Sequence, residues 1–331
     1  MDTIMKTTGM NTTGMNTTPK LDPREKHFRV PSPHAGLSLF LRYLPPRDDA
    51  AAKGRTVLYV HGGTFPSALS IAHRFDGHSW RDALCDAGFH VWGLDFHGFG
   101  TSDPYPEFAE PAAAHPPLGR AAACSRQLEA AMRFICREQG VDRVSLVAHS
   151  WGSIVCGEFA GRCPELVERM VWFGPIARRE PKGERQRLQG WRLISLKDQW
   201  DRFVGDVPAG EAPVLSKRHF DEWGELYLDS ESDSRARNPA SVKVPGGAFQ
   251  DIYDAFAGEL AYDPALVCAP VAIIRGEWDS LCTDADARWL FDAMKGAPLR
   301  RDIEIARATH LMHLEENRFA LYRETECFLR G

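Results

Sequence analysis

The stretch VSLVAHSWG, residues 144–152, decides the fold of this chain. Its first five residues are mostly apolar and β-branched, which predicts a buried strand over 144–148, and a helical pattern follows over 154–163. Ser150 lies in the turn between them, flanked by the small residues Ala148 and Gly152. This pattern matches the G-x-S-x-G nucleophile elbow with Ala148 at the first position, so Ser150 is predicted to be a nucleophile.

Strand and helix patterns alternate on both sides of this stretch. Short apolar or alternating runs predict strands at 27–30, 37–43, 56–60, 90–94, 171–173, 271–274 and 303–305. Helical periodicity marks 75–88, 121–139, 284–294 and 315–329. Such alternation predicts an α/β fold, in which a mainly parallel sheet is flanked by helices.

The alternation stops over residues 176–265, which show no clear buried strand and are rich in charged helical patterns. We therefore predict a helical cap at 176–265, inserted into a core formed by residues 26–175 and 266–331. Residues 1–25 contain a polar Thr/Asn/Gly repeat and are predicted to be a disordered tail.

A serine nucleophile needs a base and a group that orients the base. His310 follows the last predicted strand, and Asp279 lies in the loop after the strand at 271–274. The chain order Ser, Asp, His at successive strand ends supports Ser150, Asp279 and His310 as a catalytic triad. His313 competes with His310, and three acidic residues compete with Asp279, namely Glu277, Asp284 and Asp286.

Backbone N–H donors for a developing oxyanion are expected at two places. One is Gly63, in the glycine turn that begins at His61, with Thr64 as a close second. The other is Trp151, the residue directly after the predicted nucleophile.

Composition and spacing exclude several other classes of function. Of 331 residues, 40 are Lys or Arg and 45 are Asp or Glu, and a net charge of −5 gives no electrostatic footprint for nucleic acid or an anionic membrane. Neither a zinc-ligand spacing nor a glycine-rich nucleotide motif is present, so we predict no metal and no cofactor. The sequence has no apolar run of membrane-spanning length and no secretory signal, which predicts a cytoplasmic enzyme acting on a small-molecule substrate.

At these residues the chain resembles the α/β-hydrolase superfamily, in its capped serine esterase branch. The loop Asp95–Ser102 is similar to the D-x-R-G-x-G-x-S loop of that family, with His97 where Arg is usual. The stretches 61–67 and 79–82 resemble esterases of the phthalate-monoester hydrolase type. The resemblance implies cleavage of a carboxylic ester or lactone through an acyl-enzyme on Ser150.

Two alternatives remain open. Proline iminopeptidases share the Ser-Trp-Gly-Ser stretch of residues 150–153, and such an aminopeptidase would need an acidic pair in the cap, for which Glu222 and Glu225 are candidates. A non-catalytic ligand-binding homologue is the other. Haloalkane dehalogenases and epoxide hydrolases of this fold carry Asp as the nucleophile, so Ser150 argues against both.

Aromatic residues are frequent in the predicted cap and favour a bulky, largely apolar ester, or a macrocyclic lactone. The candidates for lining its pocket are Trp191, Trp200, Phe203, Phe220, Trp223, Tyr227, Phe249, Tyr253 and Phe256. For any single one of them, packing between helices is the simpler interpretation.

Overall fold

The computed structural model describes residues 20–47, 55–181 and 187–331. Within them, eight strands form one sheet in the order β1-β2-β4-β3-β5-β6-β9-β10. Only β2 runs antiparallel to its neighbours β1 and β4, and the pairs from β4 to β10 are all parallel. The strands are β1 (Lys26–Pro31), β2 (Ser38–Leu44), β3 (Thr56–Val60), β4 (His90–Asp95), β5 (Val144–His149), β6 (Val167–Phe173), β9 (Val271–Gly276) and β10 (Arg300–Ile305).

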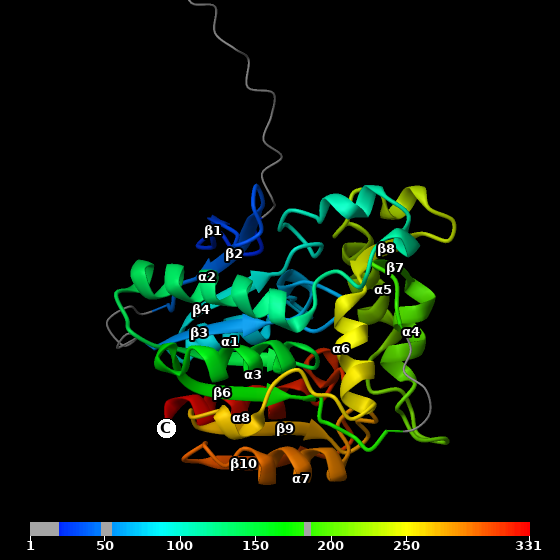
Figure 1. Cartoon of the computed structure of the whole chain (residues 1–331). Helices are drawn as coiled ribbons and strands as arrows, with labels where there is room; N and C mark the ends of the chain where they lie inside the picture. The colour runs from blue at the N-terminus through cyan, green and yellow to red at the C-terminus, as the bar shows by residue number, and fades with distance from the viewer. Residues whose placement is uncertain (1–19, 48–54, 182–186) are drawn as a thin grey trace, which may run out of the picture.

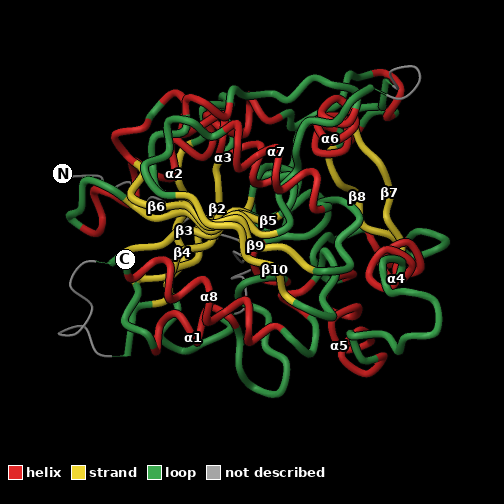
Figure 2. Tube along the Cα trace, turned by 90° about the horizontal axis from the view of Figure 1, so that it is seen from below, coloured by secondary structure: helices red, strands yellow, loops and turns green. Residues whose placement is uncertain are grey.

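Helices cover both faces of this sheet (Figures 1 and 2). In Figure 2, α2, α3 and α7 lie on one side of the strands, and α1 and α8 lie on the other. They span α1 (Trp80–Asp86), α2 (Ala121–Gln139), α3 (Gly152–Arg162), α7 (Asp284–Ala293) and α8 (Arg318–Arg330). The predicted fold class, a mainly parallel sheet flanked by helices, is confirmed.

The central strands β3 and β5 are buried along their whole length and mostly apolar, because both of their faces are covered. Leu58 and Leu146 pack in the cluster on the side of α2 and α3, whereas the adjacent Tyr59 and Val147 pack in the cluster with α1 and α8. Successive side chains of a strand point to opposite faces, so a continuous run of apolar residues contributes to the hydrophobic cores on both faces of the sheet.

Helix α1 begins later than the predicted range of 75–88. Ser79 closes a capping box with Asp82: its side chain accepts from the N–H of Asp82, while the Asp82 carboxylate accepts from the N–H of Ser79. This reciprocal cap fixes the first turn of α1 at Trp80.

The segment between β6 and β9, residues 176–265, is called the insertion below. It contains α4 (Leu196–Val204), α5 (Lys217–Leu228) and α6 (Gly247–Phe256), and it lies beyond the carboxyl ends of the parallel strands (Figure 1). The sequence showed no clear buried strand there, but β7 (Trp191–Ser195) and β8 (Ser241–Pro245) pair antiparallel. Each has only five residues and includes a basic side chain, so its apolar pattern is too short to distinguish it from a loop.

The predicted tail at 1–25 is partly wrong, and its residues 1–19 lie outside the described part of the chain. Residues 20–25 pack against the core, where the Glu25 side chain is fully buried. Its carboxylate accepts hydrogen bonds from Arg42 (2.6 Å) and Arg81 (2.8 Å), both of them buried. A buried charge is retained when it is paired and hydrogen-bonded, and apolar periodicity cannot show such a pair.

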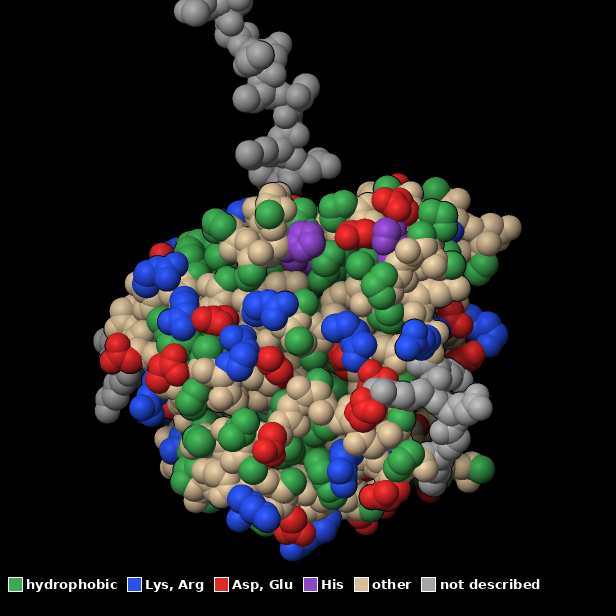
Figure 3. Space-filling model, viewed as in Figure 1, with side chains coloured by type: hydrophobic (Ala, Val, Ile, Leu, Met, Phe, Trp, Pro, Cys, Tyr) green, Lys and Arg blue, Asp and Glu red, His purple; other side chains and the backbone are tan. Residues whose placement is uncertain are grey.

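No helix of the described residues is long and apolar enough to span a membrane. On the face drawn in Figure 3, Lys and Arg side chains alternate with Asp and Glu side chains, and neither sign forms a continuous field.

Candidate active site

Ser150 occupies the sharp turn between β5 and α3. Its φ of 53° lies in the left-handed region, which non-glycine residues enter at a cost in strain that is typical of functional turns. The N–H of Ser150 donates to the carbonyl of Phe173 at 3.1 Å, which ties the turn to β6. Gly152 follows at the start of α3, where a Cβ would lie 2.7 Å from the carbonyl oxygen of His61. The small residue of the motif therefore permits the close contact between α3 and the end of β3.

His310 and Asp279 are in direct contact. The Nδ1 atom of His310 lies 3.0 and 2.9 Å from the two carboxylate oxygens of Asp279, and both side chains are buried. The N–H on Nδ1 donates to Asp279, which leaves Nε2 as the acceptor of the neutral ring. Nε2 has no hydrogen-bond partner among the described residues, and His310 lines the same cavity as Ser150.

The Asp279 carboxylate is held in its ionised form. Burial alone would raise its pKa, but attraction to His310, the hydrogen bond from that ring and the backbone N–H of Leu281 (2.9 Å) outweigh burial and lower the pKa. The N–H of Cys282 donates to the same oxygen at 3.0 Å. An ionised Asp279 fixes the tautomer of His310 and stabilises the imidazolium that forms when the ring takes a proton.

Gly174, directly after β6, makes room for this pair. Its φ is 53°, and a Cβ there would lie 2.8 Å from Nδ1 of His310 and 2.9 Å from Oδ2 of Asp279. Any other residue would displace the hydrogen-bonded pair.

The competing acidic residues are engaged elsewhere. Glu277 accepts from the N–H of Arg307 at 2.8 Å, and Asp284 forms an ion pair with Arg275 at 2.5 Å. Asp286 caps α7 and pairs with Arg179 at 2.6 Å. Of the acidic residues weighed for the triad, Asp279 is the one that contacts His310.

His313 lies behind the site and does not line the cavity. Its ring is buried between Phe65 and His149, with ring centroids 5.9 and 4.7 Å away. Burial, reinforced by repulsion from His310, lowers the pKa of His313 to about 3, so its ring is neutral. His149 is likewise buried, and burial holds its pKa well below the ordinary value.

The predicted oxyanion loop follows β3, and His61 fixes its start. The backbone N–H of Phe96 donates to Nε2 of His61 at 3.1 Å, so the ring proton is on Nδ1, which lies 2.6 Å from the carbonyl oxygen of Gly62. Gly63 and Thr64 come next, and both line the cavity beside Ser150. A Cβ on Gly63 would lie 2.9 Å from Cβ of Ala248 in α6, so the loop and the insertion are in close contact.

Trp151 links the elbow to the insertion, a role that the sequence did not suggest. Its indole N–H donates to Asp251 of α6 at 2.9 Å. Asp251 is buried and also accepts hydrogen bonds from the N–H of Ala121 (2.7 Å) and from Arg120 (2.5 Å). One carboxylate therefore joins α6, the start of α2 and the residue after the nucleophile.

The cavity beside Ser150 and His310 has a volume of about 240 Å³. Of the nine aromatic candidates in the insertion, Phe203 and Phe249 line it, while Phe220, Trp223 and Tyr227 are buried in the packing of the insertion. The cavity also has basic side chains that the sequence did not predict there, Arg192 and Arg202. Its lining is thus less apolar than we expected.

The guanidinium groups of the two arginines have protein contacts as well. Arg202 forms an ion pair with Asp206 at 2.9 Å, and Arg192 lies 4.3 Å from the ring centroid of Phe249. Glu222 and Glu225, the acidic pair considered for an aminopeptidase, do not line this cavity. They are exposed on α5 and pair with Arg218 and Arg235.

The chain was compared with known proteins. The family model described as alpha/beta hydrolase fold matches residues 55–317. No curated protein matches the chain. Among solved structures, a bromoperoxidase from Bacillus anthracis is similar at 15% identity, with a TM-score of 0.64 over 92% of this chain and 100% of that one.

Two further structures show the same architecture. A thermophilic esterase from Thermogutta terrifontis has 18% identity and a TM-score of 0.57, over 92% of this chain and 98% of its own. The epoxide hydrolase VrEH1 from Vigna radiata has 15% identity and a TM-score of 0.58, over 93% and 98%. At these identities the likeness shows the fold alone.

The class of protein follows from the sheet topology and the family match together: this is a hydrolase-fold protein with a serine in the strained turn between β5 and α3. The chain belongs to the alpha/beta hydrolase family.

Proposed function

We propose that this protein is a serine hydrolase that cleaves a carboxylic ester or lactone through an acyl-enzyme on Ser150, in a soluble, cytoplasmic setting. The observation that carries the proposal is the buried His310–Asp279 pair: His310 lines the same cavity as Ser150, which is held at φ 53°, and its Nε2 has no partner in the described part of the chain. A base oriented by a carboxylate beside a strained serine is the arrangement that nucleophilic acyl transfer requires.

In the first half-reaction, the hydroxyl oxygen of Ser150 attacks the ester carbonyl while Nε2 of His310 takes its proton. The carbonyl oxygen gains negative charge, which the backbone N–H groups of Gly63 and Trp151 stabilise. The bond to the leaving oxygen then breaks, and His310 returns the proton to it, which releases the alcohol. Asp279 stabilises the positive charge on the ring throughout the step.

In the second half-reaction, His310 takes a proton from water, and the resulting nucleophile attacks the acyl carbon on Ser150. Collapse of this second tetrahedral intermediate releases the carboxylic acid and restores the serine hydroxyl. With a lactone, the alcohol and the acid belong to one molecule, so a single hydroxy acid leaves.

We further propose that the insertion acts as a cap over this site. Residues of α4 and α6, among them Phe203 and Phe249, line the same cavity as Ser150. Contacts between the insertion and the core exclude water from a reacting ester and strengthen the electrostatic interactions there.

A panel of p-nitrophenyl esters, aliphatic lactones and proline p-nitroanilide tests the proposal. We expect turnover of esters or lactones and at least about a 10⁴-fold loss in Ser150→Ala. Turnover of the proline amide with no ester cleaved would favour the aminopeptidase alternative instead. Ester activity that persists in Ser150→Ala would overturn the assignment of the nucleophile.

A further inference from the structure

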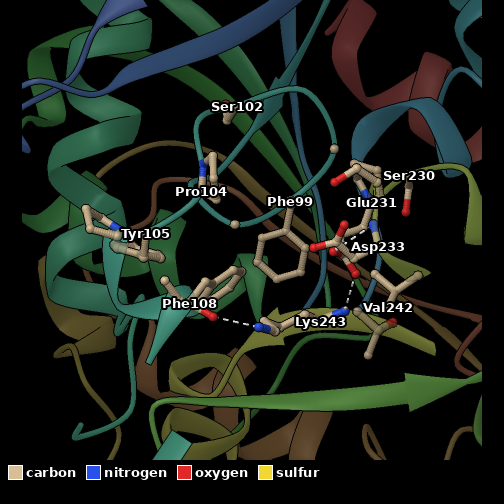
Figure 4. A pocket seen from close by; sticks show the side chains of 17 residues that line it. Phe99, Ser102, Pro104, Tyr105, Phe108, Ser230, Glu231, Asp233, Val242 and Lys243 are labelled. Atoms are coloured by element: carbon tan, nitrogen blue, oxygen red, sulfur yellow. Dashed lines mark hydrogen bonds between the residues drawn. The ribbon is translucent and has the colours of Figure 1, made fainter. Parts of the chain in front are cut away.

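A second and larger cavity lies beside the first, between the loops of the core and the insertion. Its volume is about 580 Å³. The core contributes the loop after β4, whereas the insertion contributes residues 230–233 and β8 (Figure 4). Ligand cavities in proteins usually measure roughly 300–1,000 Å³, so this cavity is of ligand size and the 240 Å³ cavity at Ser150 is below it.

The wall of the larger cavity is largely apolar. Figure 4 shows the rings of Phe99 and Phe108 side by side, with Pro104 and Tyr105 on the same side and Val242 opposite. Such a surface binds hydrocarbon by removing it from water.

Three charged residues line the other end of the cavity, and two of them, Lys243 and Glu231, have partners within the protein. Lys243 donates through Nζ to the carbonyl oxygen of Phe108 at 2.6 Å, and its ammonium lies 4.1 Å from the ring centroid of Trp191. Glu231 is paired with Arg237 through both carboxylate oxygens. Lys243 and Glu231 therefore do not call for an ionic ligand, the third residue, Asp233, is exposed to solvent, and the apolar wall favours a neutral apolar group.

Thr64 lies at the boundary between the two cavities, because it lines both of them. It directly follows Gly63, the proposed oxyanion donor, so the larger cavity begins beside the carbonyl group under attack. Ser150 and His310 line only the smaller cavity. A group that extends from the carbonyl carbon past Thr64 would therefore leave the catalytic residues and enter the larger cavity.

We propose that the larger cavity is the acyl-binding site of this enzyme and takes an extended, neutral hydrocarbon acyl chain. The leaving oxygen must lie within reach of His310, so the alcohol half starts in the smaller cavity. The acyl half then extends past Thr64 into the larger cavity. This inference rests on the proposed esterase function, and it adds a preference for long acyl groups over long alcohol groups.

Two series of esters test the proposal. One holds the alcohol constant as methyl and lengthens the acyl group from acetyl to octanoyl, and the other holds acetyl constant and lengthens the alcohol from methyl to octyl. We expect kcat/KM to rise with acyl length by up to about fourfold for each methylene that is fully buried. An equal or steeper rise along the alcohol series would overturn the assignment of the acyl half.

Filling the larger cavity from its rim should remove this preference. Ser232 of the insertion and Ala109 of the core are both exposed and line the cavity, so Ser232→Trp and Ala109→Trp place an indole there without disturbing the core. We expect at least one of them to lower the ratio of kcat/KM for octanoyl over acetyl esters tenfold or more. Ala236→Trp is the matched control, since Ala236 is exposed four residues from Ser232 and does not line the cavity. The proposal fails if both filling variants keep the ratio of the wild type.

Binding of octanamide separates this inference from the proposed function, because it needs no turnover. Calorimetry with the full chain should show binding that Ser232→Trp or Ala109→Trp weakens tenfold or more and Ala236→Trp leaves unchanged. This pattern would support the site even if no ester were cleaved, in which case the esterase function alone would fail. Octanamide binding that is equal in all four proteins, or absent from the wild type, would overturn the acyl site.

Discussion

The core and the insertion contribute to the site in different ways. In the core, Ser150, Asp279 and His310 each follow a parallel strand, so the ends of β5, β9 and β10 bring them together. The insertion contributes walls, through Phe203 and Phe249, and a buried carboxylate, Asp251, that holds the residue after the nucleophile. The difference teaches that the candidate triad residues are placed by the strands of the core, whereas the shape of the cavity and the position of Trp151 depend on residues of the insertion.

The largest effect is expected for the base in the core. His310→Ala should lower kcat by about 10⁴-fold or more, because the proton of Ser150 then has no acceptor. His313→Ala is the matched control: it removes a neighbouring buried ring that does not line the cavity, so kcat should fall by less than about tenfold. Steady-state kinetics on one activated ester would measure both. A larger loss in His313→Ala than in His310→Ala would reverse the assignment.

The next largest effect is expected for Asp279→Asn, which should lower kcat by about 10³- to 10⁴-fold. An amide can donate a hydrogen bond to Nδ1, which would place the ring proton on Nε2, where it blocks acceptance from Ser150. Glu277→Gln serves as the control, because Glu277 contacts the backbone of Arg307 instead of His310. Equal kcat values in the two variants would contradict the triad.

A smaller effect tests whether the insertion takes part in catalysis. Trp151→Phe removes the indole donor to Asp251, and we expect kcat to fall about tenfold with little change in KM, because the oxyanion N–H is displaced. Asp251→Asn should act in the same direction, since a neutral amide accepts more weakly from the Trp151 indole than a carboxylate does. Asp254→Asn, which also loses charge beside Arg120 but does not contact Trp151, is the control. If Trp151→Phe and Asp251→Asn change KM alone, the insertion contributes to substrate binding and not to the chemical step.

The last prediction concerns stability and not catalysis. Burial raises the pKa of Glu315 to about 7, although hydrogen bonds from Thr309 lower it in part. The folded state therefore binds a proton more readily than the unfolded state, whose value is 4.5. The stabilising effect of that proton is complete below about pH 4.5 and is lost as the pH rises towards 7, a difference of roughly 3 kcal/mol at most.

Denaturant unfolding of the wild type and Glu315→Gln at several pH values measures this effect. Gln retains an oxygen that can accept from Thr309 but does not ionise. The free energy of unfolding of the wild type, relative to the variant, should fall between pH 4.5 and 7 and stay level above it. A relative stability that rises over this interval would contradict the direction of the shift.

Periodicity and chain order were sufficient to predict much of the core from the sequence. Residues such as Tyr59 and Val147 alternate between two buried faces, so strands appear as continuous apolar runs, and the residues that follow them must meet at one edge. His310 was favoured over His313 because it comes first after β10, and the structure places it against Asp279.

The insertion was harder to predict for physical reasons. The contact between Trp151 and Asp251 joins residues 100 positions apart, and no local pattern encodes such a pair. The strands β7 and β8 stabilise each other by pairing, so neither has a strong signal of its own. Whether Arg192 and Arg202 face a cavity or solvent depends on how the insertion packs, which helical spacing alone does not determine.

The central claim is that Ser150 carries an acyl group during turnover. Rapid quenching of the wild type with a p-nitrophenyl ester, followed by peptide mass spectrometry, tests it most directly. We predict that the mass of the acyl group appears on the peptide containing Ser150, that Ser150→Ala carries none, and that His310→Ala fails to accumulate it. Turnover of the ester with no adduct in the wild type, or an adduct on another residue that forms equally in Ser150→Ala, would contradict the account.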